Sequence, residues 1–126
     1  MVGAAAAVRR AKARLDGLDL YPRPVRIDRV RVWVAPWVFR LPWFRRFDGY
    51  AMWSLILLRD PLGPGGSSED LLCHELCHVW QMQHRPLRMP LSYLLRGYAR
   101  NPYEVQARAA VTATRGLPEG ASSTAE

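Results

Sequence analysis

Cysteine, lysine and acidic residues are scarce in this chain of 126 residues. It has two cysteines, Cys73 and Cys77, one lysine, and eleven acidic residues against eighteen basic ones. The two cysteines are four residues apart on one predicted helix, so a disulfide framework is excluded, and free thiols are typical of a reducing compartment. We interpret both as small apolar side chains of the core.

Long hydrophobic runs are absent as well. No uninterrupted apolar stretch approaches the ~18–20 residues of a membrane-spanning helix. The first eight residues are too short and too weakly apolar for the core of a signal peptide, and charged residues follow them instead of preceding them. No internal repeat or nucleic-acid-binding motif is visible. The expected location is the cytoplasm.

Positive charge is concentrated in the first part of the chain. Residues 1–50 contain eleven basic residues against four acidic ones, whereas the remainder has seven of each. Such a segment attracts nucleic acid, an anionic membrane surface or an acidic partner, although an arginine-rich solvated face is the simpler interpretation.

The hydrophobic pattern predicts one α+β domain over residues 1–115, followed by a disordered small and polar tail over residues 116–126. Its composition, 49% apolar, is that of a globular protein. Tyrosines, prolines and glycines punctuate the chain into segments. The expected elements are a helix over 4–16, a strand over 25–34, an irregular stretch or short strand over 35–47, a turn at Asp48-Gly49, a strand over 50–59, and helices over 68–84 (capped by Ser67 or Ser68), 91–98 and 101–114.

One short run points to chemistry, the sequence His74-Glu75-Leu76-Cys77-His78. Two histidines four residues apart lie on one face of a helix, so both imidazoles reach a single zinc ion. The glutamate between them is then placed to act on a zinc-bound water. This pattern predicts Zn²⁺ as a cofactor and hydrolysis as the reaction, although a pattern of five residues also occurs by chance.

A catalytic zinc needs a third protein ligand, and two residues compete for that role. His84 lies ten residues after His74, the spacing of metzincins, but Gln81 stands where that pattern has a glycine. Glu104 lies near the start of the next predicted helix. Asn101-Pro102-Tyr103-Glu104 is also a capping box, in which Glu104 would only hold its own helix end.

Three segments, Leu71–Gln81 (LLCHELCHVWQ), Tyr93–Tyr98 (YLLRGY) and Asn101–Ala107 (NPYEVQA), favour Glu104. Together they resemble small bacterial zincin-like metallopeptidase domains of the gluzincin type. The resemblance implies a small antiparallel or mixed sheet packed on a central helix, His74, His78 and Glu104 as metal ligands, and Glu75 as the catalytic carboxylate. The chain departs from the pattern at Gln106 and Arg108, where those domains have acids.

The remaining site residues are expected from what the chemistry requires. The imidazoles need hydrogen-bond partners that orient them, for which Gln81 and Asn101 are candidates. The developing oxyanion needs a donor, for which Tyr98, Tyr103 and Arg100 are candidates. In zincins a peptide substrate lies antiparallel to an edge strand, and residues 50–59 fit that place.

Three functions compete at this point. The first is a minimal zinc peptidase acting on a peptide or protein substrate, with a possible protein partner completing the cleft. The second is a scaffold domain in which zinc staples a small core without turnover. The third is a nucleic-acid-associated protease that uses the basic residues 1–50.

Overall fold

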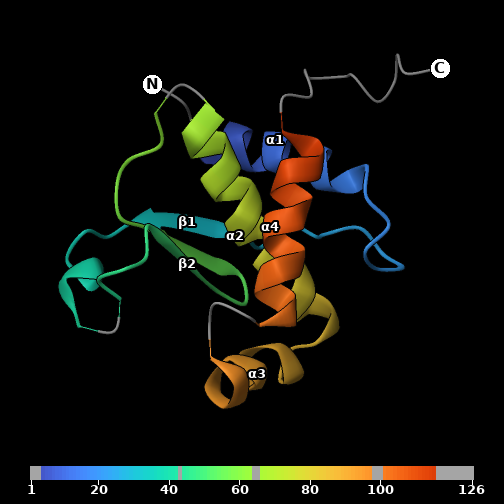
Figure 1. Ribbon diagram of the computed structural model, residues 1–126. Coiled ribbons are helices and arrows are strands. Elements are labelled where there is room, and N and C mark those ends of the chain that lie inside the picture. The colour runs from blue at the N-terminus through green and yellow to red at the C-terminus, as the bar shows by residue number, and fades with distance from the viewer. Residues whose placement is uncertain (1–3, 43, 64–65, 98–100, 116–126) are drawn as a thin grey trace.

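The computed structural model describes residues 4–42, 44–63, 66–97 and 101–115. Within them the chain is α+β, as the sequence predicts (Figure 1). Its elements in chain order are α1 (Ala4–Asp16), β1 (Arg31–Val34), the 3₁₀ helix η1 (Val38–Arg40), β2 (Gly49–Met52), β3 (Leu55–Leu58), α2 (Gly66–His84), α3 (Arg88–Arg96) and α4 (Pro102–Thr114). None of the described helices is both long and apolar enough to cross a membrane.

The three strands form one mixed sheet with β3 in the centre. The order is β1-β3-β2; β1 pairs with β3 in parallel and β2 pairs with it in antiparallel orientation. Both sides of β3 are therefore hydrogen-bonded, whereas β2 is an edge strand. Alternate residues of β3 point to opposite faces, and both faces are covered.

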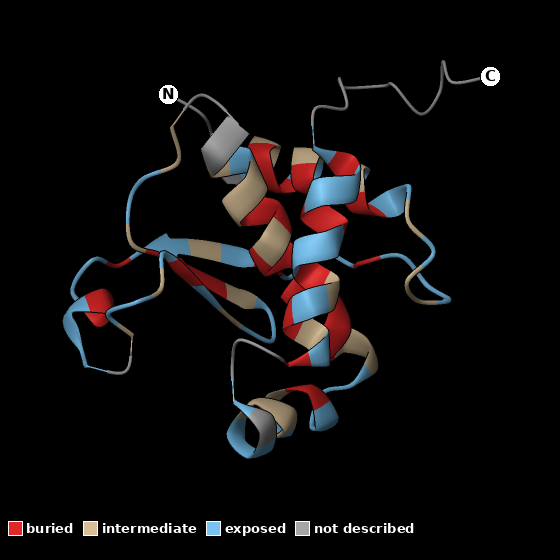
Figure 2. Ribbon diagram, viewed as in Figure 1, coloured by how far each residue is buried: buried red, intermediate tan, exposed pale blue. Residues whose placement is uncertain are grey.

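Helix α2 is the centre of the main core. It packs against the sheet on one side and against α1 and α4 on the other, so most of its residues are buried (Figure 2). Ile56 and Leu58 of β3 join this core, while Leu57 on the opposite face packs against Val38 and Phe39 of η1. The cysteines are buried core side chains, as expected. Burial around most of its circumference explains why α2 is apolar except on the side that carries Glu75, His78 and Gln81.

The predicted single strand over residues 50–59 is wrong, because this segment is a hairpin. Met52 pairs with Leu55, so the turn is formed by Trp53 and Ser54 and not by Asp48-Gly49, and Gly49 opens β2. Trp53 has a left-handed φ of 50°, which is unfavourable for a bulky residue. Two hydrogen bonds hold it, from its N–H to Met82 Sδ (3.3 Å) and from its indole Nε1–H to Pro86 O (3.1 Å). These tertiary contacts are invisible in a local pattern.

Two further expectations about the first half were only partly right. The strand predicted over 25–34 is limited to Arg31–Val34, because a turn at Asp28 and Arg29 precedes it. The stretch 35–47 contains η1 and turns but no strand in its described part. Among the tryptophans that the structure describes, Trp80 is in the core, whereas Trp33, Trp37 and Trp53 are exposed. Trp43 lies outside the described residues.

The helix predictions are closer to the structure. Helix α1 has the predicted bounds, and α2 ends at His84 as predicted. Helix α2 begins at Gly66, so neither serine is its N-cap; Ser68 Oγ instead accepts a hydrogen bond from the N–H of Gly63 (3.1 Å). Helix α3 begins three residues earlier than predicted because Pro90 lies in its first turn, where a missing N–H costs no helical hydrogen bond. The predicted tail lies outside the described residues.

Candidate functional site

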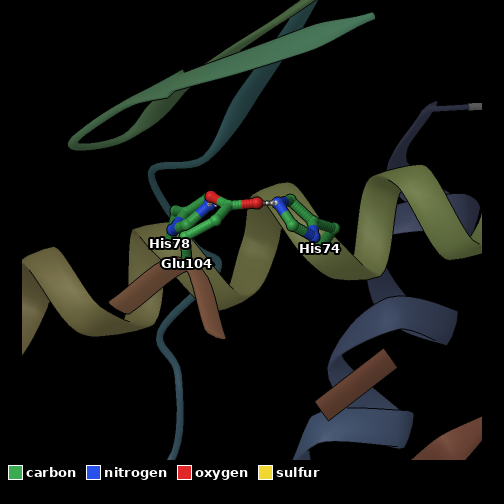
Figure 3. Close-up of side chains that lie close together, drawn as sticks. All are labelled: His74, His78 and Glu104. Atoms are coloured by element: carbon green, nitrogen blue, oxygen red, sulfur yellow. Dashed lines mark hydrogen bonds and ion pairs between the residues drawn. The ribbon is translucent and has the colours of Figure 1, made fainter. Parts of the chain in front are cut away.

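His74, His78 and Glu104 converge where α2 packs against α4 (Figure 3). The histidines are one turn apart on the face of α2 that meets α4, and Glu104 is in the first turn of α4. His74 Nε2 lies 3.1 Å from His78 Nε2 and 2.9 Å from Glu104 Oε2, and His78 Nε2 lies 3.0 Å from Glu104 Oε1. Among the described residues, these three are the group whose ligand atoms are close enough to hold one metal ion.

The hydrogen bonds of Gln81 determine which nitrogen of His78 carries a proton. The Nε2 amide group of Gln81 donates to the backbone oxygen of Tyr103 (2.8 Å), which can only accept, so the Oε1 of Gln81 must face His78 Nδ1 (2.8 Å). That oxygen accepts a hydrogen bond from the N–H at Nδ1 of His78. In the neutral ring, Nε2 is then unprotonated, and its lone pair points at His74 and Glu104.

This arrangement fits a zinc ion better than it fits the side chains alone. A lone pair of His78 faces a carboxylate, and Glu104 Oε2 is buried with no donor in hydrogen-bond geometry, although His74 Nε2 is close. A cation between these atoms removes the repulsion. Tetrahedral zinc with bonds of about 2.0–2.1 Å separates its ligands by roughly 3.4 Å. The three atom pairs given above are a few tenths of an ångström closer than this, with the two histidines facing different oxygens of Glu104.

Asn101, and not Glu104, supplies the side chain that caps α4. The cap of α4 is the side chain of Asn101, which accepts a hydrogen bond from the N–H of Tyr103 (2.8 Å). Glu104 is fully buried and its carboxylate is turned to the histidines. Burial by itself raises the pKa of Glu104. When protons and not a metal occupy the site, hydrogen bonds and positive charge from His74 and His78 outweigh the burial and hold that pKa well below its usual range. The carboxylate is therefore ionised, as a metal ligand must be.

Glu75 is the second buried carboxylate of the site, and it is not one of the three converging residues. It is 5% exposed. The pKa of Glu75 is raised to about 7: burial is the largest cause, His78 opposes it, and the negative charge of Glu104 adds to it. Gly49 of the edge strand β2 lies directly against it: a Cβ at that position would be 3.2 Å from the Cγ and Oε2 of Glu75. The absence of a side chain at Gly49 therefore lets β2 approach this carboxylate.

Two cavities flank the cluster and share Glu75 and Gly49 in their walls. One, of about 330 Å³, is mainly apolar and reaches His78; its lining includes Phe44, Tyr50, Met82, Met89 and Tyr93. The other, of about 530 Å³, is polar and reaches His74 and Glu104; its lining includes Arg46, Asp70, Arg108 and Arg115. The candidate metal group therefore opens to space on two sides and is not enclosed by protein.

The other sequence candidates divide clearly. Gln81 contacts His78 as expected, whereas Asn101 caps α4 and donates to Ser92 Oγ (3.0 Å). The structure does not bring His84 to the cluster: its ring stacks on Tyr21 with centroids 4.7 Å apart, and its Nδ1 lies 3.2 Å from Trp80 O. Tyr103 lines a separate groove beside α3. Tyr98 and Arg100 lie outside the described residues.

Sequence reasoning missed Tyr93 and Gly49. The hydroxyl of Tyr93 donates to Glu104 Oε1 (3.2 Å), and its ring lies edge-on to that of His78 at a centroid distance of 6.0 Å. Its spacing of four from Met89, opposite the leucines of α3, was a usable signal for an inward face. Arg108, the departure from the expected acid, lies 3.3 Å from Glu104 Oε2 through its Nε. Gln106 extends the hydrogen-bond network, because its Oε1 accepts from Gln81 Nε2 (2.9 Å).

Comparison with protein-family models, curated proteins and solved structures finds no match for this chain. The site is therefore interpreted from its own residues.

Replacing Gln81 with Met removes the acceptor that fixes the proton of His78 on Nδ1. We expect the affinity of the chain for Zn²⁺ to fall about 10–100-fold, because a partner that orients a metal-binding imidazole contributes on that order. A chelator competition titration measures this affinity. Gln83→Met is the matched control, because Gln83 bonds to the backbone of Arg26 and not to the site. Equal zinc affinity in the Gln81 variant and in the wild type would contradict this role of Gln81.

Proposed function

We propose that this protein is a zinc-dependent peptidase in which His74, His78 and Glu104 hold the metal and Glu75 is the general base. The observation that carries the proposal is Glu75 itself. Its buried carboxylate lies beside the three converging residues but is not one of the candidate metal ligands, and it lines both cavities.

The position of Glu75 favours catalysis over a purely structural metal site. Within the described part of the chain, Glu75 forms no hydrogen bond or ion pair. Burying a carboxylate in this way costs folding free energy, so a zinc that only held the core together would gain nothing from it. Structural zinc sites also have four protein ligands and are closed. Here three ligand residues come together next to open space, which leaves a coordination position for a reactant.

Zinc in such a set supplies a Lewis acid, which activates water and polarises a carbonyl oxygen. The protein supplies the rest. Glu75 accepts a proton from the attacking water on its carboxylate and delivers it to the leaving amine. Gln81 keeps the lone pair of His78 directed into the site. The ionised Glu104 compensates one of the two positive charges of the metal.

Among the described residues, Tyr93 is the candidate for the oxyanion donor, since Tyr103 lines the groove beside α3; Tyr98 and Arg100 lie outside the described residues. Its hydroxyl is a neutral donor at the wall of the cavity that Glu75 and His78 also line. The hydrogen bond to Glu104 holds this hydroxyl next to the metal ligands. When charge develops on the substrate oxygen, the single proton of this hydroxyl turns from Glu104 to that oxygen, while the ring of Tyr93 keeps its place beside His78.

We expect the substrate backbone to bind along the edge strand β2. One side of β2 is paired with β3, and its other side borders the apolar cavity through Gly49, Tyr50 and Ala51. An extended peptide that adds to this edge passes Glu75 at Gly49, and the cavity receives one of its apolar side chains. This position belongs to β2 and not to the whole segment 50–59, since β3 is central.

Glu75→Gln tests the proposal. The amide keeps the shape of the side chain but accepts no proton at neutral pH, so we expect peptide hydrolysis to fall about 10²–10⁴-fold with zinc content unchanged. Cleavage of a fluorogenic peptide library and metal analysis of the same samples measure both quantities. Glu69→Gln, an exposed change in the first turn of the same helix, is the control.

If Glu75→Gln hydrolysed the library as fast as the wild type, Glu75 would not be the base and the mechanism would fail. If the zinc-loaded wild type cleaved nothing while zinc raised its melting temperature, the chain would be a zinc-stapled scaffold instead.

Gly49→Ala tests the contact between the edge strand and the base. The new Cβ lies 3.2 Å from Glu75, so the carboxylate must shift by a few tenths of an ångström. We expect hydrolysis to fall about tenfold, because small displacements of a reacting group are costly, while zinc affinity stays the same. Gly63→Ala is the matched control, since its Cβ would meet only Ser68 Oγ at 3.9 Å. Unchanged hydrolysis in the Gly49 variant would show that β2 does not constrain Glu75.

A further inference from the structure

Helix α3 presents a row of leucines to solvent on the side away from the rest of the protein. Leu87, at its N-cap, is 77% exposed, Leu91 51%, Leu94 82% and Leu95 76%. Their spacing of four, seven and eight residues from Leu87 places them on one face of the helix. We call these four residues the leucine stripe. Figure 2 shows α3 standing apart from the helices around α2, with exposed residues along its outer side.

The opposite face of α3 fixes the helix to the protein. Met89 is buried, Tyr93 donates to Glu104, and Ser92 Oγ accepts a hydrogen bond from Asn101 Nδ2. Because these contacts set the orientation of α3, the leucine stripe cannot turn inward without breaking them. Its exposure is therefore a consequence of the fold, and four leucines on one face form an apolar patch of the kind that marks an interaction site.

The sequence that contains the leucine stripe carries charge of one sign. Residues 76–103 contain four arginines, at positions 85, 88, 96 and 100, and no acidic residue. Arg85 and Arg88 are exposed at the start of α3. Trp53, also exposed, donates its indole N–H to Pro86 O, so it lies at the same end of the stripe. Leucines and a tryptophan flanked by arginines form the composition of a helix that lies in a lipid interface.

We propose that the leucine stripe docks this protein onto an anionic lipid surface. The leucines enter the boundary between headgroups and acyl chains, and the exposed Arg85 and Arg88 contact the lipid phosphates. A groove of about 510 Å³ beside the stripe supports this proposal. Its lining combines Leu91, Leu95 and Pro102 with Arg88, Ser92 and Tyr103, so it offers an apolar surface and a cation together.

Two other occupants fit less well. A second copy of the chain would bring two segments of charge +4 against each other, which opposes association. Helix α3 is too short to span a bilayer, because its nine residues are fewer than half of the ~20 that a spanning helix requires. The docking does not depend on the proposed peptidase activity. It would place the apolar cavity, which Met89 and Tyr93 line from the other face of α3, directly above the lipid surface.

Co-sedimentation of the full chain with vesicles tests this inference. One set contains phosphatidylcholine alone and the other contains phosphatidylglycerol mixed with it. We expect the chain to bind the anionic vesicles and to be released as NaCl is raised. The double variant Leu94→Gln, Leu95→Gln should lower the partition onto anionic vesicles about tenfold or more, with an unchanged melting temperature, because both side chains are almost fully exposed. Leu41→Gln, an exposed leucine next to η1, is the control and should bind as the wild type does.

Equal binding of the wild type and the double variant, or no binding of the wild type to anionic vesicles, would overturn the inference. Sedimentation equilibrium shows whether a second copy of the chain covers the leucine stripe instead. If the wild type were a dimer that the double variant converted to monomers, and vesicles bound neither, the leucine stripe would be a contact between copies of this chain.

Discussion

The rest of the site depends on one constraint: two imidazole nitrogens on α2 and one carboxylate on α4 face each other where the two helices meet. His74, His78 and Glu104 direct lone pairs and negative charge into one small volume. Such a group is stable only with a cation or a shared proton inside it. Each neighbouring polar contact follows from that requirement: Gln81 holds the proton of His78 on Nδ1, and Tyr93 donates to Glu104.

The protein carries this polar group because its apolar core lies on other faces of the same helix. Helix α2 contributes Leu72, Leu76 and Val79 to the core shared with α1, α4 and β3, while Glu75, His78 and Gln81 are buried on its polar side. The free energy lost by burying these polar groups is offset by hydrogen bonding and by the apolar contacts around them. Helix α3 also has two different faces: Met89 and Tyr93 lie toward the site, and the leucine stripe lies toward solvent.

Much of the helical architecture could be predicted from the sequence, because local signals determine it. Asn101 followed by Pro102 predicts the start of α4 correctly, since capping is a contact within one turn. The convergence of His74, His78 and Glu104 also agrees with the prediction, because the first two lie at helical spacing and the third follows a recognisable cap.

The sheet and the surroundings of the site were harder to predict, because contacts distant in sequence decide them. Residues 50–59 have the apolar pattern of one strand, yet Trp53 turns the chain through bonds to Met82 and Pro86. Tyr93 was missed for a similar reason, since its role depends on where α3 packs. Gly49 is meaningful only once β2 lies against Glu75. The local sequence pattern carries no information about these contacts between residues that are far apart in the chain.

X-ray absorption at the zinc edge of the purified, zinc-loaded protein tests the central claim most directly, because it identifies the atoms bound to the metal. The account predicts one zinc per chain with nitrogen and oxygen neighbours at about 2.0–2.2 Å, two of them with the scattering pattern of imidazole, and no sulfur. A sulfur neighbour at about 2.3 Å would assign the metal to Cys73 or Cys77, both buried in the core. That result, or the absence of bound zinc, would contradict the site described above.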